Sequence, residues 1–261
     1  MKIMKQKLYS SVVLAMLLFI SSCTQAQRVV GSGNLVTKGV RVGSFNSLKL
    51  QGSPDVIYKQ TAGKPSVELY GSDNIVNLLE VRTENGILLI KFKDNVNILN
   101  RGKLEVRVSG PSLEQINIQG SGDVLLVNGM KSDKGIAFSI QGSGDIEGKG
   151  IKCPLLSLSV RGSGDIDLSE VSSRRTDVKI AGSGDISLSG RSQEVDFGVS
   201  GSGDINAAGL MAQKVLAKIS GSGDISCYAT DYLTGSVSGS GDVAYKGNPR
   251  IEFSKKGLHK L

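Results

Sequence analysis

Apolar and polar residues alternate with a period of two through much of residues 111–248. Apolar side chains stand two and four residues before a recurring Gly-Ser-Gly motif: Ile118 and Ile116, Ile140 and Phe138, Val160 and Leu158, Ile180 and Val178, Val199 and Phe197, and Ile219 and Ala217. The residues between them are small or polar, as at Ser139 and Gln141. The alternation resumes after the motif, for example at Ile166 and Leu168. This period indicates β-strands that each bury one face.

The motif between these strands is the tetrapeptide Gly-Ser-Gly-Asp, which occurs seven times. Its aspartates are Asp123, Asp145, Asp165, Asp185, Asp204, Asp224 and Asp242, at steps of 22, 20, 20, 19, 20 and 18 residues. A fixed period of this length is typical of solenoids, in which stacked repeats bury the apolar face that one repeat cannot bury alone. Each repeat is predicted to contain a strand, a Gly-Ser-Gly-Asp corner, a second strand and a loop. We therefore predict an all-β protein with a right-handed parallel β-solenoid over residues 111–248.

Residues 45–110 keep the alternation but lose the strict repeat. Strands are predicted at 45–50, 54–60, 66–70, 79–84, 87–93 and 103–109. Asn85-Gly86 predicts a hairpin turn, Ser72-Asp73-Asn74 predicts the cap of a short helix over about 73–78, and Gln51-Gly52-Ser53-Pro54-Asp55 resembles a degenerate corner. This irregular, hairpin-rich half is predicted to cover the N-terminal end of the solenoid, because an open end would expose an unpaired sheet edge.

The first 22 residues have the pattern of a targeting segment. Three lysines among the first seven residues precede an apolar run from Val12 to Ile20, which is too short to span a bilayer. The run ends in Ile20-Ser21-Ser22-Cys23, which resembles the bacterial lipobox, where cleavage precedes the cysteine and a lipid is attached to its sulfur. An ordinary signal peptide with an incidental cysteine is the alternative. Residues 23–44 would then be a tether and leader. Loss of residues 1–22 removes three lysines and no acid, so the formal net charge falls from +7 to +4.

Residues 249–261 predict a last irregular strand and a basic tail. His259, the only histidine of the chain, lies in this tail and is expected to be solvated. The 34 glycines are assigned to corners rather than to disorder, because the apolar alternation persists around them.

Several of these features together, in this order, resemble one known family. They are the lipobox, Gly31-Ser32-Gly33-Asn34, the irregular β half with its Asp73-Asn74 turn, the Gly-Ser-Gly-Asp rungs and the closing segment 239–249. Over nearly all of its mature length the chain resembles the family described as putative auto-transporter adhesin, head GIN domain. The resemblance implies a β-solenoid carried by a bacterial envelope lipoprotein, and it brings no catalytic residues with it.

Two chemistries are open to the seven corner aspartates. In the structural one, each carboxylate accepts a backbone N–H of its own corner, as in an Asx turn, and the glycines adopt backbone angles that other residues avoid. In the other, carboxylates stacked ~4.8 Å apart share calcium ions. Calcium takes about six to eight oxygens, and one acid per rung supplies few of them. The structural role is therefore preferred, and no cofactor is predicted.

The outward strand positions favour a binding function. They are rich in Ser, Gln, Asn, Lys and Arg, which suit an unknown glycan or protein ligand. A basic patch is predicted from Arg161, Arg174, Arg175, Lys179 and Lys218, with ordinary solvated charge as the alternative. An aromatic content of 5% disfavours nucleic acid as a partner. The pattern does not indicate an oligomeric state.

A polysaccharide-processing β-helix enzyme is the second hypothesis. It would use convergent acids, for which Asp165 and Asp167 are candidates, but the acids form a regular ladder and no phosphate loop, zinc spacing or nucleophile elbow is present. We therefore predict a non-enzymatic lipoprotein of the cell envelope, held in the outer membrane through lipid on Cys23. Residues 24–27 contain no acid, which favours the periplasmic side over the cell surface.

The two remaining cysteines are predicted to stay unbonded. Cys153 and Cys227 lie about four rungs apart, hence ~19 Å along the axis at the usual strand spacing. A disulfide needs Cα atoms within ~7 Å of each other.

Overall fold

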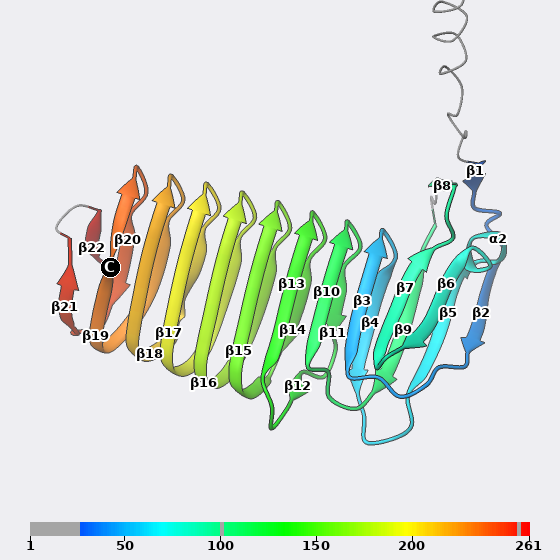
Figure 1. The fold of residues 1–261 in the computed structure, drawn as a ribbon, viewed down its shortest axis with the longest axis horizontal. Coiled ribbons are helices and arrows are strands. Elements are labelled where there is room, and N and C mark those ends of the chain that lie inside the picture. The colour runs from blue at the N-terminus through cyan, green and yellow to red at the C-terminus, as the bar shows by residue number, and fades with distance from the viewer. Residues whose placement is uncertain (1–26, 100–101, 255–256) are drawn as a thin grey trace, which may run out of the picture.

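The computed structural model describes residues 27–99, 102–254 and 257–261. The signal segment and Cys23 lie outside these residues, so their predicted roles stay predictions. The described chain is a long stack of parallel strands with a less regular cap at its N-terminal end (Figure 1). The predicted all-β solenoid is confirmed. Within the described residues, no helix is both long enough and apolar enough to cross a membrane.

Successive turns of the chain pair in parallel along the stack. The paired strands are β3 (Ser47–Gly52), β4 (Asp55–Gln60), β10 (Gln115–Gly120), β11 (Val124–Leu126), β12 (Met130–Lys131), β13 (Ile136–Gly142), β14 (Ile146–Lys149), β15 (Ile151–Gly162), β16 (Ile166–Gly182), β17 (Ile186–Gly201), β18 (Ile205–Gly221), β19 (Ile225–Gly239), β20 (Val243–Lys246), β21 (Arg250–Phe253) and β22 (Leu258–Lys260). We call the stacked segments that lead into each Gly-Ser-Gly-Asp corner sheet A, and those that follow it sheet B. From β16 onward, one continuous strand runs from one corner to the next.

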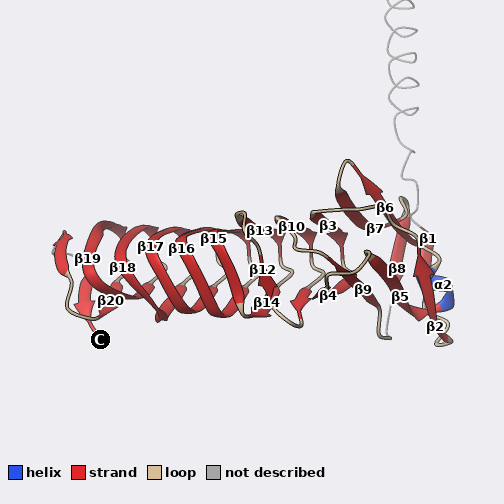
Figure 2. Cartoon of the chain, turned by 90° about the horizontal axis from the view of Figure 1, so that it is seen from below, coloured by secondary structure: helices blue, strands red, loops and turns tan. Residues whose placement is uncertain are grey.

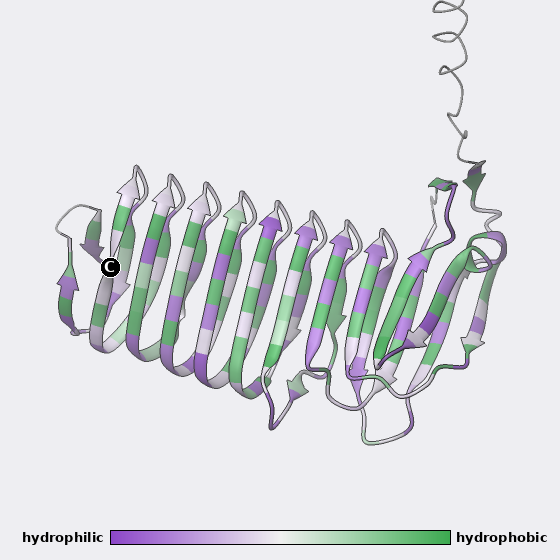
Figure 3. Ribbon diagram, viewed as in Figure 1, coloured by the Kyte–Doolittle hydropathy of each residue, from purple (hydrophilic) through white to green (hydrophobic). Residues whose placement is uncertain are grey.

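The register of the stack places equivalent residues of successive rungs side by side. In sheet A, Ile140 pairs with Val160 and Val160 with Ile180, and all three side chains are buried. In sheet B, Ile146 pairs with Ile166 and Ile166 with Ile186, and these are buried as well. The core therefore lies between the two sheets as columns of apolar side chains. Bands of opposite hydropathy cross the strands accordingly in Figure 3.

The degenerate corner at residues 52–55 forms a rung of the solenoid. β3 pairs with β10 and β4 with β11, both in parallel, so the rung pattern extends N-terminal to residues 111–248. At the other end, β21 pairs with β19 and β22 with β20, so residues beyond the last corner continue the coil.

The cap departs from parallel stacking. It contains β1 (Gln27–Val30), β2 (Leu35–Val40), β5 (Ser66–Ser72), α2 (Asp73–Val76), β6 (Leu79–Glu84), β7 (Ile87–Phe92), β8 (Val96–Leu99) and β9 (Glu105–Gly110). β5 pairs antiparallel with both β2 and β9, and β6 with β7, whereas β7 and β9 pair in parallel with β3 and β4. The cap thus joins antiparallel hairpins to the first rung, as seen from below in Figure 2.

Two local predictions in the cap have different outcomes. Asn85 and Gly86 have φ of 50° and 77° between the antiparallel β6 and β7, which confirms the hairpin turn. The short helix α2 is present, but Ser72 makes no side-chain capping bond. Its hydroxyl instead accepts the N–H of Gly33 at 3.3 Å, because the leader lies against this end of the helix. The strands β1, β2 and β8 were not among the predicted ones.

Candidate binding surface

Each corner is tied to the one before it by three successive N–H groups. The N–H groups of Ser143 and Gly144 donate to the carbonyl of Gly120 at 2.9 and 3.2 Å. The N–H of Asp145 donates to Oδ1 of Asp123 at 2.9 Å. The same side-chain bond recurs from Asp55 to Asp242 with lengths of 2.7–3.2 Å. The aspartates therefore act as acceptors between rungs.

This geometry corrects the expected Asx turn. The prediction that each carboxylate accepts an N–H of its own corner is wrong, because the N–H groups of stacked parallel strands point toward the neighbouring rung. The structural role of the aspartates nevertheless fits the bonds they make. Among the described residues, no group of three or more His, Cys, Asp or Glu side chains is arranged to hold a metal ion.

The two glycines of a corner are required for different reasons. Gly182 has φ of 147°, which L side chains rarely adopt. Gly184 has no positive φ, but a Cβ there would lie 2.1 Å from the carbonyl oxygen of Gly164 in the preceding rung. The first glycine permits the turn, and the second permits the rungs to approach.

The acids that an enzyme would use are committed elsewhere. Oδ1 of Asp165 accepts the N–H of Asp185 at 2.7 Å, and Asp165 and Asp167 are both exposed. An acidic groove of about 410 Å³ lies near the cap, and its one buried acid is Glu105. The hydrogen bond from Lys103 lowers the pKa of Glu105, assisted by Arg107, so this carboxyl is held ionised. Glu105 is therefore not available as the protonated general acid of a carboxylate pair.

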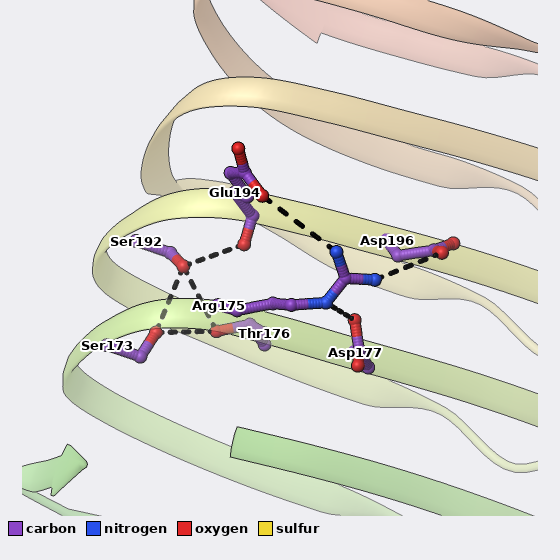
Figure 4. Close-up of polar contacts among 7 residues, drawn as sticks. All are labelled: Ser173, Arg175, Thr176, Asp177, Ser192, Glu194 and Asp196. Atoms are coloured by element: carbon purple, nitrogen blue, oxygen red, sulfur yellow. Dashed lines mark hydrogen bonds and ion pairs between the residues drawn. The ribbon is translucent and has the colours of Figure 1, made fainter. Parts of the chain in front are cut away.

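The predicted basic patch divides into three places. Arg175 is committed to an acidic cluster, with its guanidinium nitrogens 2.8 Å from Asp177, 3.6 Å from Asp196 and 3.9 Å from Glu194 (Figure 4). Arg174 lines a separate groove of about 690 Å³ together with Lys131 and Lys152. Arg161, Lys179 and Lys218 line a third groove, described next. The five residues therefore do not form one patch.

The third groove lies on sheet A and has a volume of about 660 Å³. Lys179 pairs with Gly198, and Gly198 pairs with Lys218, so the glycine lies between two lysines in adjacent rungs. In the neighbouring column, Arg161 is followed by small residues, Ala181, Ser200, Ser220 and Ser238. We call this site the Gly198 groove. Among the described residues, none of its three cations makes an ion pair or a side-chain hydrogen bond, in contrast to Arg175.

A buried polar cluster was missed by the sequence analysis. The hydroxyls of Ser173 and Thr176 lie 2.7 Å apart, and that of Ser173 donates to Ser192 at 3.0 Å (Figure 4). Thr176 is fully buried and stands in a column between Leu156 and Val195. The sequence could have indicated this cluster, because Thr176 is a polar residue at a position where the alternation expects an apolar one. Thr176 and Ser192 are buried, whereas Ser173 is half-buried and lines the groove of Arg174, so the three hydroxyls bond to one another from the core to the edge of that groove.

Both described cysteines are free and buried, in agreement with the prediction. Burial raises the pKa of the Cys153 thiol to about 11 and that of Cys227 to about 12. The thiolate, which is the reactive form, is thus disfavoured at both positions.

The fold and surface define a class of protein: a parallel β-solenoid whose sheets face the core on one side and solvent, with shallow grooves, on the other. The chain belongs to the family described as putative auto-transporter adhesin, head GIN domain, whose model matches residues 44–249. The resemblance drawn from the motifs is therefore confirmed. No curated protein matches the chain.

Several solved structures share the fold. A putative lipid binding protein from Parabacteroides distasonis is 29% identical, with a TM-score of 0.84 and coverage of 90% of this chain and 100% of that one. A putative adhesin from Parabacteroides merdae is 25% identical, with a TM-score of 0.84 and the same coverage. A putative adhesin from Bacteroides fragilis is 29% identical, with a TM-score of 0.67 and coverage of 89% and 98%. The family and these neighbours support a non-enzymatic, adhesin-like role at the cell envelope or surface.

Proposed function

We propose that this protein is an envelope lipoprotein whose rigid solenoid presents sheet A to a glycan or protein ligand. The observation that carries the proposal is the contrast between the edges and the faces of the stack. The corner groups bond between rungs, whereas Arg161, Lys179 and Lys218 around the Gly198 groove are exposed and make no ion pair or side-chain hydrogen bond within the described part of the chain. A surface held by a continuous hydrogen-bonded stack loses little conformational entropy on binding, which favours recognition of an extended ligand.

The anchor in this proposal is a lipid on Cys23. This residue precedes Gln27, where β1 begins, by four positions, so the tether spans at most ~14 Å even when fully extended. With so short a tether, the cap end of the solenoid would be held close to the membrane. The Gly198 groove lies in the later rungs, β15–β19, and is therefore remote from the tether along the stack. The outer membrane, on its periplasmic side, remains the location we propose.

Ligand binding is tested with the purified protein on arrays of envelope glycans, host glycans and envelope proteins. We expect saturable binding to a restricted set of ligands. The absence of binding to every array member would refute a ligand-presenting role. Turnover of any glycan during the incubation, seen as shortened chains by mass spectrometry, would instead support the enzyme hypothesis.

Anchoring is tested by mass spectrometry of the protein extracted from membranes. We expect Cys23 to be the mature N-terminus and to carry lipid. An unmodified N-terminus after Cys23 in a soluble fraction would contradict the proposal. Protease treatment of intact cells then distinguishes the two sides of the outer membrane, since a periplasmic solenoid is protected until the membrane is opened.

A further inference from the structure

Gly198 is a glycine that the fold does not require. It has no positive φ, and a Cβ built on it would meet nothing closer than the carbonyl of Val178 at 3.8 Å. The other glycines of strands β15–β19, a fully described part of the chain, have a positive φ or a Cβ contact of 3.0 Å or less. Glycine in the interior of a strand weakens it and often marks a bulge, a bend or a close approach by a ligand or another backbone. The register is unbroken through Gly198, so no bulge accounts for it. The absence of a side chain at Gly198 thus needs an explanation outside the packing of the rungs.

The surroundings of Gly198 supply that explanation. Its flanking partners Lys179 and Lys218 are both exposed, and their positions are two rungs apart, ~9.6 Å at the usual strand spacing. Arg161 lies one rung before Lys179 and is exposed as well. Asp196, the one acid that lines the groove, is 3.6 Å from Arg175, a partner that it shares with Asp177 and Glu194. The groove therefore presents three cations, which make no ion pair with any described residue, and one acid around a floor that lacks side-chain bulk.

The floor also has a shape that suits sugar rings. Gly198, Ala181 and Ser200 project little from the strands, whereas the longer side chains of Lys179 and Lys218 line the groove from the rungs on either side of Gly198. Lysine stems offer apolar surface while their ammonium groups remain in water. A ring with apolar C–H faces fits such a floor, and anionic substituents on the ring edges reach the ammonium groups. A neutral ligand would leave these cations unused.

We propose that the Gly198 groove binds an acidic glycan chain, one whose sugars carry carboxylate or sulfate groups. The proposal rests on the ligand-presenting role above and names the ligand class and the site. Lys179, Lys218 and Arg161 contact the anionic groups, and Gly198 admits the sugar ring between the two lysines. Binding is weakened by salt, because interactions between exposed charges are largely screened beyond about 10 Å at 0.1 M ionic strength, and this distance shortens as salt rises.

The probes are polygalacturonate and chondroitin sulfate, with methyl-esterified polygalacturonate as the neutral match. The full-length protein is titrated with each by calorimetry or by surface binding. We expect it to bind at least one acidic chain, and to bind the esterified chain at least tenfold more weakly, which corresponds to ~1.4 kcal/mol. Failure to bind either acidic chain, or equal binding of the esterified one, would overturn the proposal.

The site is tested with two variants. Gly198→Val fills the floor of the groove and places a good strand former in β17, so we expect an unchanged or higher unfolding midpoint together with at least tenfold weaker binding. Lys179→Glu/Lys218→Glu should abolish detectable binding and leave the midpoint within error. The matched control, Lys131→Glu/Lys152→Glu, makes the same charge change in the separate groove of Arg174 and should retain binding.

The remaining outcomes separate the proposals from each other. Equal loss in the control double variant would indicate attraction to the overall charge and would overturn the groove. Binding of phosphatidylglycerol vesicles that depends on the same lysines and displaces the glycan would indicate a lipid headgroup instead. If ligands found on the arrays bind all three variants as well as the parent, the Gly198 groove is not the binding site. The ligand-presenting role would still stand.

Discussion

The corner edge and the outward face of sheet A use the same residue type for opposite purposes. At the corners, glycine recurs in every rung, and Gly184 has the carbonyl of Gly164 only 2.1 Å from where its Cβ would be. On sheet A, Gly198 occurs once in its column, between Lys179 and Lys218, and a Cβ there would make only ordinary contacts, the nearest at 3.8 Å. The repeated glycine is dictated by the stack, and the single one is not. In a solenoid, strict repetition marks what every rung needs, and a departure from it marks a candidate site.

The largest effect that separates the two regions is expected from Gly184→Val. The added side chain collides with the backbone of the preceding rung, and the strands must move apart to admit it. We expect the free energy of unfolding to fall by about 3 kcal/mol or more, the range of severe overpacking. Urea denaturation followed by circular dichroism measures the change.

The same substitution at Gly198 is the control for this prediction, since it sits in the same rung stack without a colliding atom. Equal destabilisation by Gly184→Val and Gly198→Val would remove the distinction between the two glycines. An unchanged midpoint for Gly184→Val would show that the rungs separate easily.

A smaller effect is expected where the corner side chain is removed instead. Asp185→Ala deletes the acceptor of the Asp204 N–H, a bond of 2.8 Å. Because water can reach this exposed edge, we expect a loss of about 1 kcal/mol rather than the full penalty of a buried unsatisfied group. Asp185→Asn should cost less, since its amide oxygen can still accept. Thermal unfolding of the three proteins ranks them, and an Asn variant as unstable as the Ala variant would contradict the acceptor role.

The same proteins test the calcium alternative. With the carboxylates engaged between rungs, we expect millimolar calcium or a chelator to leave the melting curve of the parent unchanged. A ligand that binds only the folded state stabilises it, and the gain grows as the logarithm of the free ligand concentration once this exceeds Kd. A calcium-dependent rise in the melting temperature that is diminished in Asp185→Asn would make the corners metal sites.

The corner illustrates how far the sequence alone could reach. The period and alternation predicted the solenoid, and Gly-Ser-Gly-Asp predicted where the chain turns. The partner of each aspartate was mispredicted, because spacing within one repeat carries no information about which rung supplies the N–H. The basic residues were grouped wrongly for a related reason. Arg174 and Arg175 are adjacent in sequence, yet one lines a groove and the other pairs with Asp177, Glu194 and Asp196 of its own and the next rung.

The buried thiols allow a test of the core beneath sheets A and B. Burial raises the pKa of Cys227 from 9.0 to about 12 and that of Cys153 from 9.0 to about 11. The folded state therefore favours the protonated thiols, and this contribution to stability is fully present below pH 9 and is lost as the pH rises toward 12. We expect the urea midpoint to fall from pH 8 to pH 10, and to fall less in Cys227→Ala.

Tyr58 must be controlled in that experiment. Tyr58 is fully buried, and burial raises its pKa as well. Its ionisation therefore also lowers the stability of the folded state as the pH rises. Repeating the measurement in a Tyr58→Phe variant separates the effect of the tyrosine from that of the thiols. The fall in stability caused by the thiols begins near pH 9 and should persist in this variant. A thiol reagent that modifies Cys153 or Cys227 in the native protein at pH 8 would contradict their burial.

The smallest effect is expected at the Arg175 cluster, which shares sheet A with the Gly198 groove but has its charges paired. Arg175→Met removes the cation that faces Asp177, Glu194 and Asp196, while Lys214 still lies 3.1 Å from Glu194. Because Arg175 is half-exposed and water screens its ion pairs, we expect a loss of at most about 1 kcal/mol. The loss should shrink as salt rises, and Lys214→Met, which removes one partner only, should lose less. Urea midpoints at low and high salt provide the measurement. A loss of more than about 2 kcal/mol that salt does not reduce would mean that Arg175 stabilises the fold through the packing of its stem rather than through its ion pairs. The difference between Arg175 and the cations of the Gly198 groove would then not be one of ion pairing.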